Sequence, residues 1–276
     1  MRSDRRAVSP AISSVILTSG VVVLLLVTIA FANNFLNARM AENEFSAVKQ
    51  FMQTVGLQID DVAWTIGRTQ TIRYASKFGQ VNFESTALNY TVFVDKGSGY
   101  VYLANYTVGV LLFNMPIDKY SVGNNYHERI IPTSDRSFLQ VGTSAPVSHV
   151  FVMEKIPMND GNFIRVVVAP SVRMINSTIT TGGVQKNYFK FYLAVLFPGP
   201  NPRYSQSVSL VGDTVAVRTE SNVNKIKISL SFPKTGLGFD SSFFKFDSIV
   251  QEVDVPNGSI MEFYSGKVKI SLGLQV

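Results

Sequence analysis

The feature that most constrains this chain of 276 residues is a long apolar stretch close to its N-terminus. No side chain from Ala7 to Ala38 is ionisable, and most residues between Ala11 and Ala32 are Leu, Ile, Val or Phe. A helix rises about 1.5 Å per residue, so about 20 such residues cross the roughly 30 Å hydrocarbon layer of a bilayer. The stretch therefore predicts a helix that inserts into a membrane.

The charges before this stretch predict its orientation. Arg2, Arg5 and Arg6 stand against the single Asp4. Basic residues beside a membrane helix favour the cytoplasmic side. We therefore expect a single-pass protein of the cell membrane whose C-terminus is extracellular.

The junction Arg5-Arg6-Ala7, followed by Val8-Ser9-Pro10, resembles the class III signal peptide of the archaeal type IV pilin and archaellin superfamily. In that family a prepilin peptidase cuts after a small residue that follows a basic one. The resemblance implies a leader of residues 1–7, cleavage after Ala7 and a mature chain that begins at Val8. Bacterial type IV pilins have a glutamate at the fifth mature position, whereas this chain has Ile12, which points to the archaeal branch.

Two other interpretations of the apolar stretch stay open. One is an ordinary secretory signal peptide, with Ala30-Phe31-Ala32 as its cleavage site. The stretch is longer than the apolar region of most such signals, which argues against this interpretation. The other is a plain membrane anchor that is neither cut nor assembled.

The helix is expected to continue beyond the membrane, over residues 8–78 in all, because no proline stands between Pro10 and Pro116. Apolar residues recur there at alternating spacings of three and four, which is typical of one apolar seam along a helix. Such a seam must pack against the chain's own later domain, against copies of the chain, or against both. The residues expected in the helix core contacts of a filament are Val15, Val22, Ile29, Phe45, Val48, Met52, Val55, Ile59 and Val62.

From about residue 79 the pattern changes to that of β-strands. The runs from Lys225 to Phe232 and from Lys267 to Leu272 alternate between polar and apolar residues, as strands with one buried face do. The runs 149–153, 163–168 and 188–197 are apolar on both faces and predict central strands. Together with the helix, they predict an α+β fold with an extracellular antiparallel β-sandwich head over 79–276. A sandwich head on a helical tail is also what the resemblance implies, and we expect it to be Ig-like.

Glycine-containing pairs predict the turns of this head. They occur at Gly97-Ser98-Gly99, Gly212-Asp213, Asn257-Gly258 and Ser265-Gly266. The proline-rich segment 198–202 cannot lie inside a strand, so it predicts either a long loop or the boundary between two lobes.

The sequence offers little that points to chemistry. It contains no cysteine, which excludes disulfides and thiolate ligands, and its two histidines, His127 and His149, are far apart. We expect both to be structural, and we expect no catalytic residue, no metal and no cofactor. The net charge of +6 is spread along the chain, so it does not indicate nucleic acid.

Four glycosylation sequons begin at Asn89, Asn105, Asn176 and Asn257. They are compatible with a surface glycoprotein, although a chain with this much Asn, Ser and Thr contains about as many by chance. Asn257 also has a structural interpretation, as the first residue of a turn.

The resemblance implies a structural subunit of an archaeal type IV pilus-like surface filament. Such a protein is a homo-oligomer, waits in the membrane before assembly, depends on a prepilin peptidase and an assembly machinery, and serves adhesion or surface attachment. The alternative is a minor pilin or a monomeric, membrane-anchored extracellular binding protein, which the size of the head favours. An enzyme with paired Asp or Glu residues is the third and weakest hypothesis.

Overall fold

The computed structural model describes residues 8–181, 183–200 and 206–273. The chain divides into two compact units, Met1–Asn43 and Glu44–Val276, which we call the N-terminal unit and the head. The elements, in order, are α1 (Val8–Ala63), β1 (Thr69–Arg73), β2 (Gln80–Asp95), β3 (Tyr100–Pro116), β4 (Tyr126–Ile131), β5 (Leu139–Val141), β6 (Ser148–Glu154), β7 (Phe163–Pro170), β8 (Val172–Thr181), β9 (Val184–Pro198), β10 (Ser207–Ser231), η1 (Thr235–Leu237), α2 (Ser241–Phe244) and β11 (Val250–Leu272).

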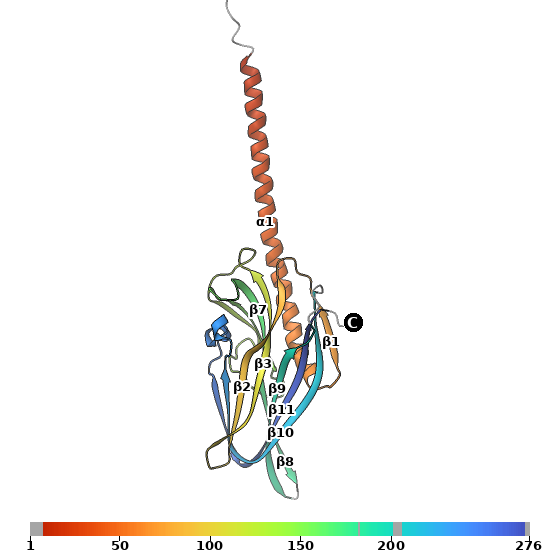
Figure 1. Cartoon of the computed structure of the whole chain (residues 1–276), viewed down its shortest axis with the longest axis vertical. Helices are drawn as coiled ribbons and strands as arrows, with labels where there is room; N and C mark the ends of the chain where they lie inside the picture. Colours follow the sequence, from red (N-terminus) through yellow and green to blue (C-terminus); the bar gives the residue numbers. More distant parts are fainter. Residues whose placement is uncertain (1–7, 182, 201–205, 274–276) are drawn as a thin grey trace, which may run out of the picture. The chain divides into compact units, whose positions relative to one another are not determined.

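The long helix and the β-rich head confirm the predicted α+β class, but the sheet is not a pair of separate antiparallel sheets. Its strands pair in one path, β4-β6-β7-β3-β2-β10-β11-β9-β8-β5, with β1 added beside β10. The pairs β9–β11 and β5–β8 are parallel, and the other pairs are antiparallel. Figure 1 shows the long strands of the head lying side by side. The structure therefore does not confirm an Ig-like sandwich.

The sheet curls so that distant strands share one core. The rings of Tyr106 on β3 and Phe263 on β11 stack with centroids 5.0 Å apart, although β2 and β10 separate these strands along the path. Phe263 also stacks on Phe191 of β9 at 6.1 Å. One apolar cluster joins these residues to Phe151 of β6 and Val167 of β7. The core consequently lies between the two halves of one curled sheet, and the head is not split into two lobes at Pro198.

The part of α1 that follows Glu44 covers the other face of this sheet. Gly56 lies so close to β6 that a Cβ there would be 2.6 Å from Cγ2 of Val150, and the Ser148 hydroxyl donates a hydrogen bond of 2.9 Å to the Gly56 carbonyl. Because β6 has the helix on one face and the core on the other, all of its residues are buried. The structure confirms that 149–153, 163–168 and 188–197 are strands, which belong to β6, β7 and β9. Cover on both faces explains the continuous apolar run of β6.

The helix ends earlier than predicted. α1 stops at Ala63 rather than near residue 78, and Thr69–Arg73 forms β1 against β10. Gly67 has a φ of +80°, a value that suits glycine, and its amide donates a hydrogen bond of 2.8 Å to the carbonyl of Gly212. The chain therefore pairs with β10 directly after the last helical turn. This strand pairing outweighs the helical spacing of apolar residues that continues in the sequence.

Two predicted turns have a different role. Gly212 lies inside β10 and Gly266 inside β11. A Cβ at Gly212 would collide with the carbonyl oxygen of Thr65, and one at Gly266 with that of Ala63. Both glycines therefore let the end of α1 approach the sheet closely instead of reversing the chain.

The other turn predictions divide in the same way. The segment from Gly97 to Gly99 does connect β2 to β3, as predicted. Gly258, with a φ of +82°, lies within the long strand β11 opposite an irregular stretch of β10. The prediction of a turn was therefore correct only for the first of these two segments. Of the segment 198–202, residues 201 and 202 lie outside the described residues.

Candidate assembly surface

The N-terminal unit presents an uninterrupted apolar surface. Its large apolar side chains between Ile12 and Met40 are each about half exposed or more, for example Leu24 at 67% and Phe31 at 72%. Among the described residues, α1 is the one helix long and apolar enough to cross a membrane. Such an area is unfavourable in water, and the length and composition of the helix are compatible with a membrane span.

Three hydroxyl side chains within this surface form hydrogen bonds with the helix itself. The hydroxyl of Thr18 donates to the carbonyl of Ser14 at 2.8 Å, that of Ser19 to Ile16 at 2.9 Å, and that of Thr28 to Leu24 at 2.7 Å. Because of these bonds, none of the three hydroxyls needs a hydrogen bond to water. This lowers the free-energy cost of moving the helix into an apolar environment.

The apolar surface ends at a charged cluster. The Arg39 guanidinium lies 5.4 Å from the centroid of the Phe35 ring and 2.8 Å from a carboxylate oxygen of Glu42. Aromatic and basic residues are typical of the boundary between hydrocarbon and water. The cluster therefore marks where the uncharged part of α1 ends.

The residues predicted for helix core contacts fall into two groups. Val15, Val22 and Ile29 are exposed, at 66%, 54% and 56%. The other six are at most 4% exposed because the head's own sheet covers them, namely Phe45, Val48, Met52, Val55, Ile59 and Val62. The seam therefore packs within the chain, and its six residues are not available for contacts between copies. The sequence left both arrangements open, since a periodic pattern does not identify the surface that covers it.

Polar contacts that the sequence did not indicate hold the head segment of α1. The Glu44 carboxylate accepts hydrogen bonds from the amides of Lys77 and Phe78, at 2.8 and 3.0 Å, and from the hydroxyl of Ser76. At the other side, Lys49 forms an ion pair of 2.8 Å with Glu128 on β4. Acidic residues on a helix surface are common, so no sequence signal distinguishes Glu44 from its neighbours.

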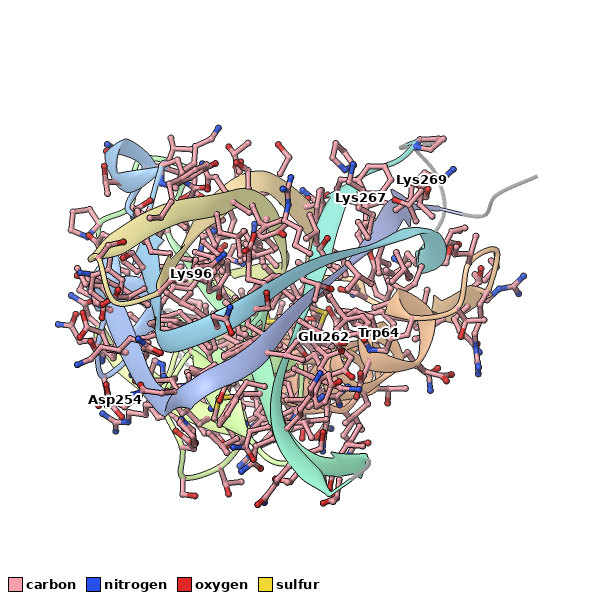
Figure 2. The ribbon with its side chains drawn as sticks, turned by 90° about the horizontal axis from the view of Figure 1, so that it is seen from below. Trp64, Lys96, Asp254, Glu262, Lys267 and Lys269 are labelled. Atoms are coloured by element: carbon pink, nitrogen blue, oxygen red, sulfur yellow. The ribbon has the colours of Figure 1, made fainter. Side chains whose placement is uncertain are left out.

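The end of α1 is fixed by an aromatic cluster. The ring of Trp64 meets Tyr192 edge-on at 5.2 Å, and Tyr192 stacks on Tyr264 at 4.8 Å. Glu262, labelled together with Trp64 in Figure 2, accepts a hydrogen bond of 2.7 Å from the Tyr264 hydroxyl. Burial, followed by the bond to Glu262, raises the pKa of Tyr264 to about 12. The cluster therefore anchors the helix end with neutral rings.

A shallow groove lies beside this cluster. It has a volume of about 240 Å³ and is lined by Leu57 of α1, Pro132, the segment 143–147 and the ion pair between Asp60 and Arg173. That pair is 2.7 Å long, and Asp60 also accepts a hydrogen bond of 2.7 Å from the Trp64 indole. The carboxylate is thus engaged on both oxygens.

One of the two histidines, His149, is buried and hydrogen-bonded. The Arg129 guanidinium is 2.9 Å from Nδ1 of His149, and Nε2 of His149 is 2.9 Å from the carbonyl oxygen of Ser137. Since arginine only donates, Nδ1 accepts and Nε2 carries the proton, so the ring is neutral. Burial, with the Arg129 charge second, lowers the pKa of His149 to about 3.

The second histidine belongs to the same region. The ring of His127 stacks on Phe151 at 5.1 Å, and burial lowers its pKa to about 4. The arrangement is that of packing residues and offers no metal site. Indeed, no cluster of His, Asp and Glu that could hold a metal ion occurs in the part of the chain that the structure describes.

The sequons differ in accessibility. Asn105, Asn176 and Asn257 are exposed, whereas Asn89 is half-buried on β2, where its side-chain oxygen accepts a hydrogen bond of 3.4 Å from Thr107. Glycosylation at these four residues stays a prediction.

The leader residues Arg5, Arg6 and Ala7 lie outside the described residues, which begin with Val8 in α1. Cleavage after Ala7 is therefore also still a prediction.

Comparison of the chain with protein-family models, with curated proteins and with solved structures found no match.

Proposed function

We propose that this chain is a structural subunit of an archaeal type IV pilus-like surface filament that serves adhesion or surface attachment. The observation that supports the proposal most is the apolar surface of α1 between Ile12 and Met40, which is exposed and free of charge up to Arg39. A half-exposed Leu, Ile or Val contributes roughly 1 kcal/mol when it leaves water, so this surface is strongly driven into an apolar environment.

In the proposed mechanism the membrane holds the subunit first. Removal of the leader after Ala7 then takes away Arg2, Arg5 and Arg6, and the helices of other copies replace lipid around α1. Small residues such as Ser13 and Gly20 allow helix backbones to approach one another. The seam from Phe45 to Val62 is already covered in the head, which leaves the apolar surface of the N-terminal unit for contacts between copies.

The alternative is a minor pilin or a monomeric anchored binding protein. The size of the head, Glu44–Val276, supports this alternative, because the head is large for the repeating unit of a thin filament. In this case the same helix would anchor single copies, or a few, and the head would carry the binding function.

A test that separates these functions compares two matched substitutions in cells. Val22→Arg places a charge in the apolar surface, at a cost of about 2.5–3.5 kcal/mol in a membrane helix, while Val217→Arg places the same charge on an exposed strand of the head. Filaments sheared from cells should contain the parent and Val217→Arg as dominant species that begin at Val8, and they should lack Val22→Arg.

Two results would count against the filament. If the parent stays in the detergent-extracted membrane with Met1 intact, the protein is a simple anchor. If sheared material contains the chain only as a trace component, the minor pilin is favoured. A chain that begins at Asn33 and is freely secreted would exclude both functions.

A further inference from the structure

The outer face of the head carries an ordered array of side chains on four adjacent strands, β11, β10, β2 and β3. Alternate residues of these strands, such as Ile226, Ile228 and Tyr90, are buried in the core, so the residues between them face outward. We call this set the outer grid. Its rows of paired residues are Asp254, Lys225, Asp95 and Tyr100; Glu252, Lys227, Phe93 and Tyr102; Val250, Ser229, Thr91 and Asn105; and Ser231, Asn89 and Thr107.

The outer grid contains three carboxylates and two lysines, and each lysine is paired with a carboxylate. Lys225 forms an ion pair of 3.1 Å with Asp254, and Lys227 one of 3.4 Å with Glu252. Asp95 accepts hydrogen bonds from the amides of Gly97 and Gly99, at 2.7 and 3.0 Å. Figure 2 shows Asp254 and the neighbouring Lys96 on the same side of the head. The two lysines of the grid are therefore not free to attract an anionic polymer.

Aromatic rings lie exposed in the outer grid. Tyr100 and Tyr102 are 39% and 59% exposed, and Phe93 meets Tyr102 edge-on with ring centroids 6.1 Å apart. The Lys227 ammonium lies 5.1 Å from the centroid of the Tyr100 ring. Because these rings stand on paired strands, and Phe93 and Tyr102 contact each other, they lose little entropy when a ligand binds.

Hydroxyl and amide groups occupy the remaining rows. Within the described ranges, the side chains of Thr91, Asn105, Ser229 and Ser231 form no hydrogen bond or ion pair with the protein. Successive rows are about 7 Å apart along the strands and adjacent strands about 4.8 Å apart. The grid thus offers regularly spaced donors and acceptors beside exposed aromatic rings.

We propose that the outer grid binds a neutral polysaccharide chain. A pyranose ring has an apolar face of C–H groups and a rim of hydroxyls, which complement the rings of Tyr100 and Tyr102 and the free polar groups of Thr91, Asn105 and Ser229. Only Val250 among the grid residues is aliphatic, which disfavours the apolar core of a protein–protein interface. The inference deepens the proposed function, for which it names the ligand class, and it applies equally to an anchored monomer.

The test uses the full chain in detergent, produced in a host that lacks N-glycosylation, because two sequons lie in the outer grid. Binding of cellohexaose and mannohexaose is measured by titration calorimetry, with anionic hexagalacturonate for comparison. We expect saturable binding of at least one neutral hexaose, at least tenfold weaker in Tyr102→Ala and in Asn105→Ala. Tyr188→Ala, which removes a partly exposed ring on β9 outside the grid, should bind like the parent.

Circular dichroism shows whether each variant is folded, and Asn105 is exposed, so its truncation should leave the fold intact. The inference is overturned if no neutral hexaose binds, if hexagalacturonate binds more tightly than the neutral sugars, or if both grid variants bind like the parent. The measurement involves no filament, so failure here leaves the proposed assembly standing, and loss of filaments in Val22→Arg leaves this binding standing.

Discussion

Acidification should weaken the head through His149 in particular. This side chain is fully buried, and its Nδ1 accepts a hydrogen bond of 2.9 Å from the Arg129 guanidinium. A proton on Nδ1 would face that guanidinium, while the nearby Asp135 offers only a weak opposing charge. The folded head therefore keeps the ring neutral under conditions in which the unfolded chain protonates it.

The magnitude follows from the two pKa values. The pKa of His149 is about 3 in the folded head and about 6.5 in the unfolded chain. Since the unfolded state binds the extra proton, this contribution is fully present above pH 6.5 and is lost as the pH falls towards 3. Between pH 7 and pH 4.5 the loss amounts to roughly 2.5 kcal/mol in the free energy of unfolding.

The assay compares the parent with His149→Gln, whose amide can accept from Arg129 and donate to Ser137 but does not titrate. Urea unfolding in detergent is followed at pH 7 and pH 4.5 through Trp64, the only tryptophan of the chain. Carboxylates and His127 titrate in both proteins, so their effects cancel in the comparison. The difference in unfolding free energy between the two pH values should be smaller in His149→Gln by roughly 2.5 kcal/mol.

An unchanged pH dependence in His149→Gln would refute the reasoning, because it would mean that the folded head accommodates the protonated ring. A lower stability of the variant at both pH values alike would reflect altered packing and would not rescue the argument.

Three further predictions concern α1. Met52→Ala, at a fully buried position of the seam, should lower the unfolding free energy of the head by about 3 kcal/mol, whereas Leu57→Ala, at 53% exposure, should change it by less than about 0.5 kcal/mol in the same urea assay. Glu44→Ala removes the acceptor of two amides and should cost about 2 kcal/mol, seen also as faster hydrogen exchange at Phe78. A Cβ added at Gly20 meets nothing within 4 Å, so Gly20→Leu should insert into the membrane normally but yield fewer sheared filaments. Normal filament yield would contradict close packing at Gly20.

Local patterns in the sequence were sufficient for the kinds of element and for much of their burial. The absence of charge between Ala7 and Ala38 predicts the long exposed helix, and the spacing of Phe45, Met52 and Ile59 predicts which side of it is buried. Alternation in Lys225–Phe232 correctly predicts a strand with one face outward. These features follow from the period of a helix or a strand, which neighbouring residues express directly.

The tertiary structure alone decided which surfaces meet. It covers the seam with the chain's own sheet, ends α1 at Ala63, and uses Gly212 and Gly266 for close approach of the helix end. It also joins all strands in one curled sheet and thereby aligns the residues of the outer grid from four separate stretches of sequence. The periodicity of a segment shows which way each of its residues faces. The partner of that residue depends on how distant segments are brought together, which no local pattern contains.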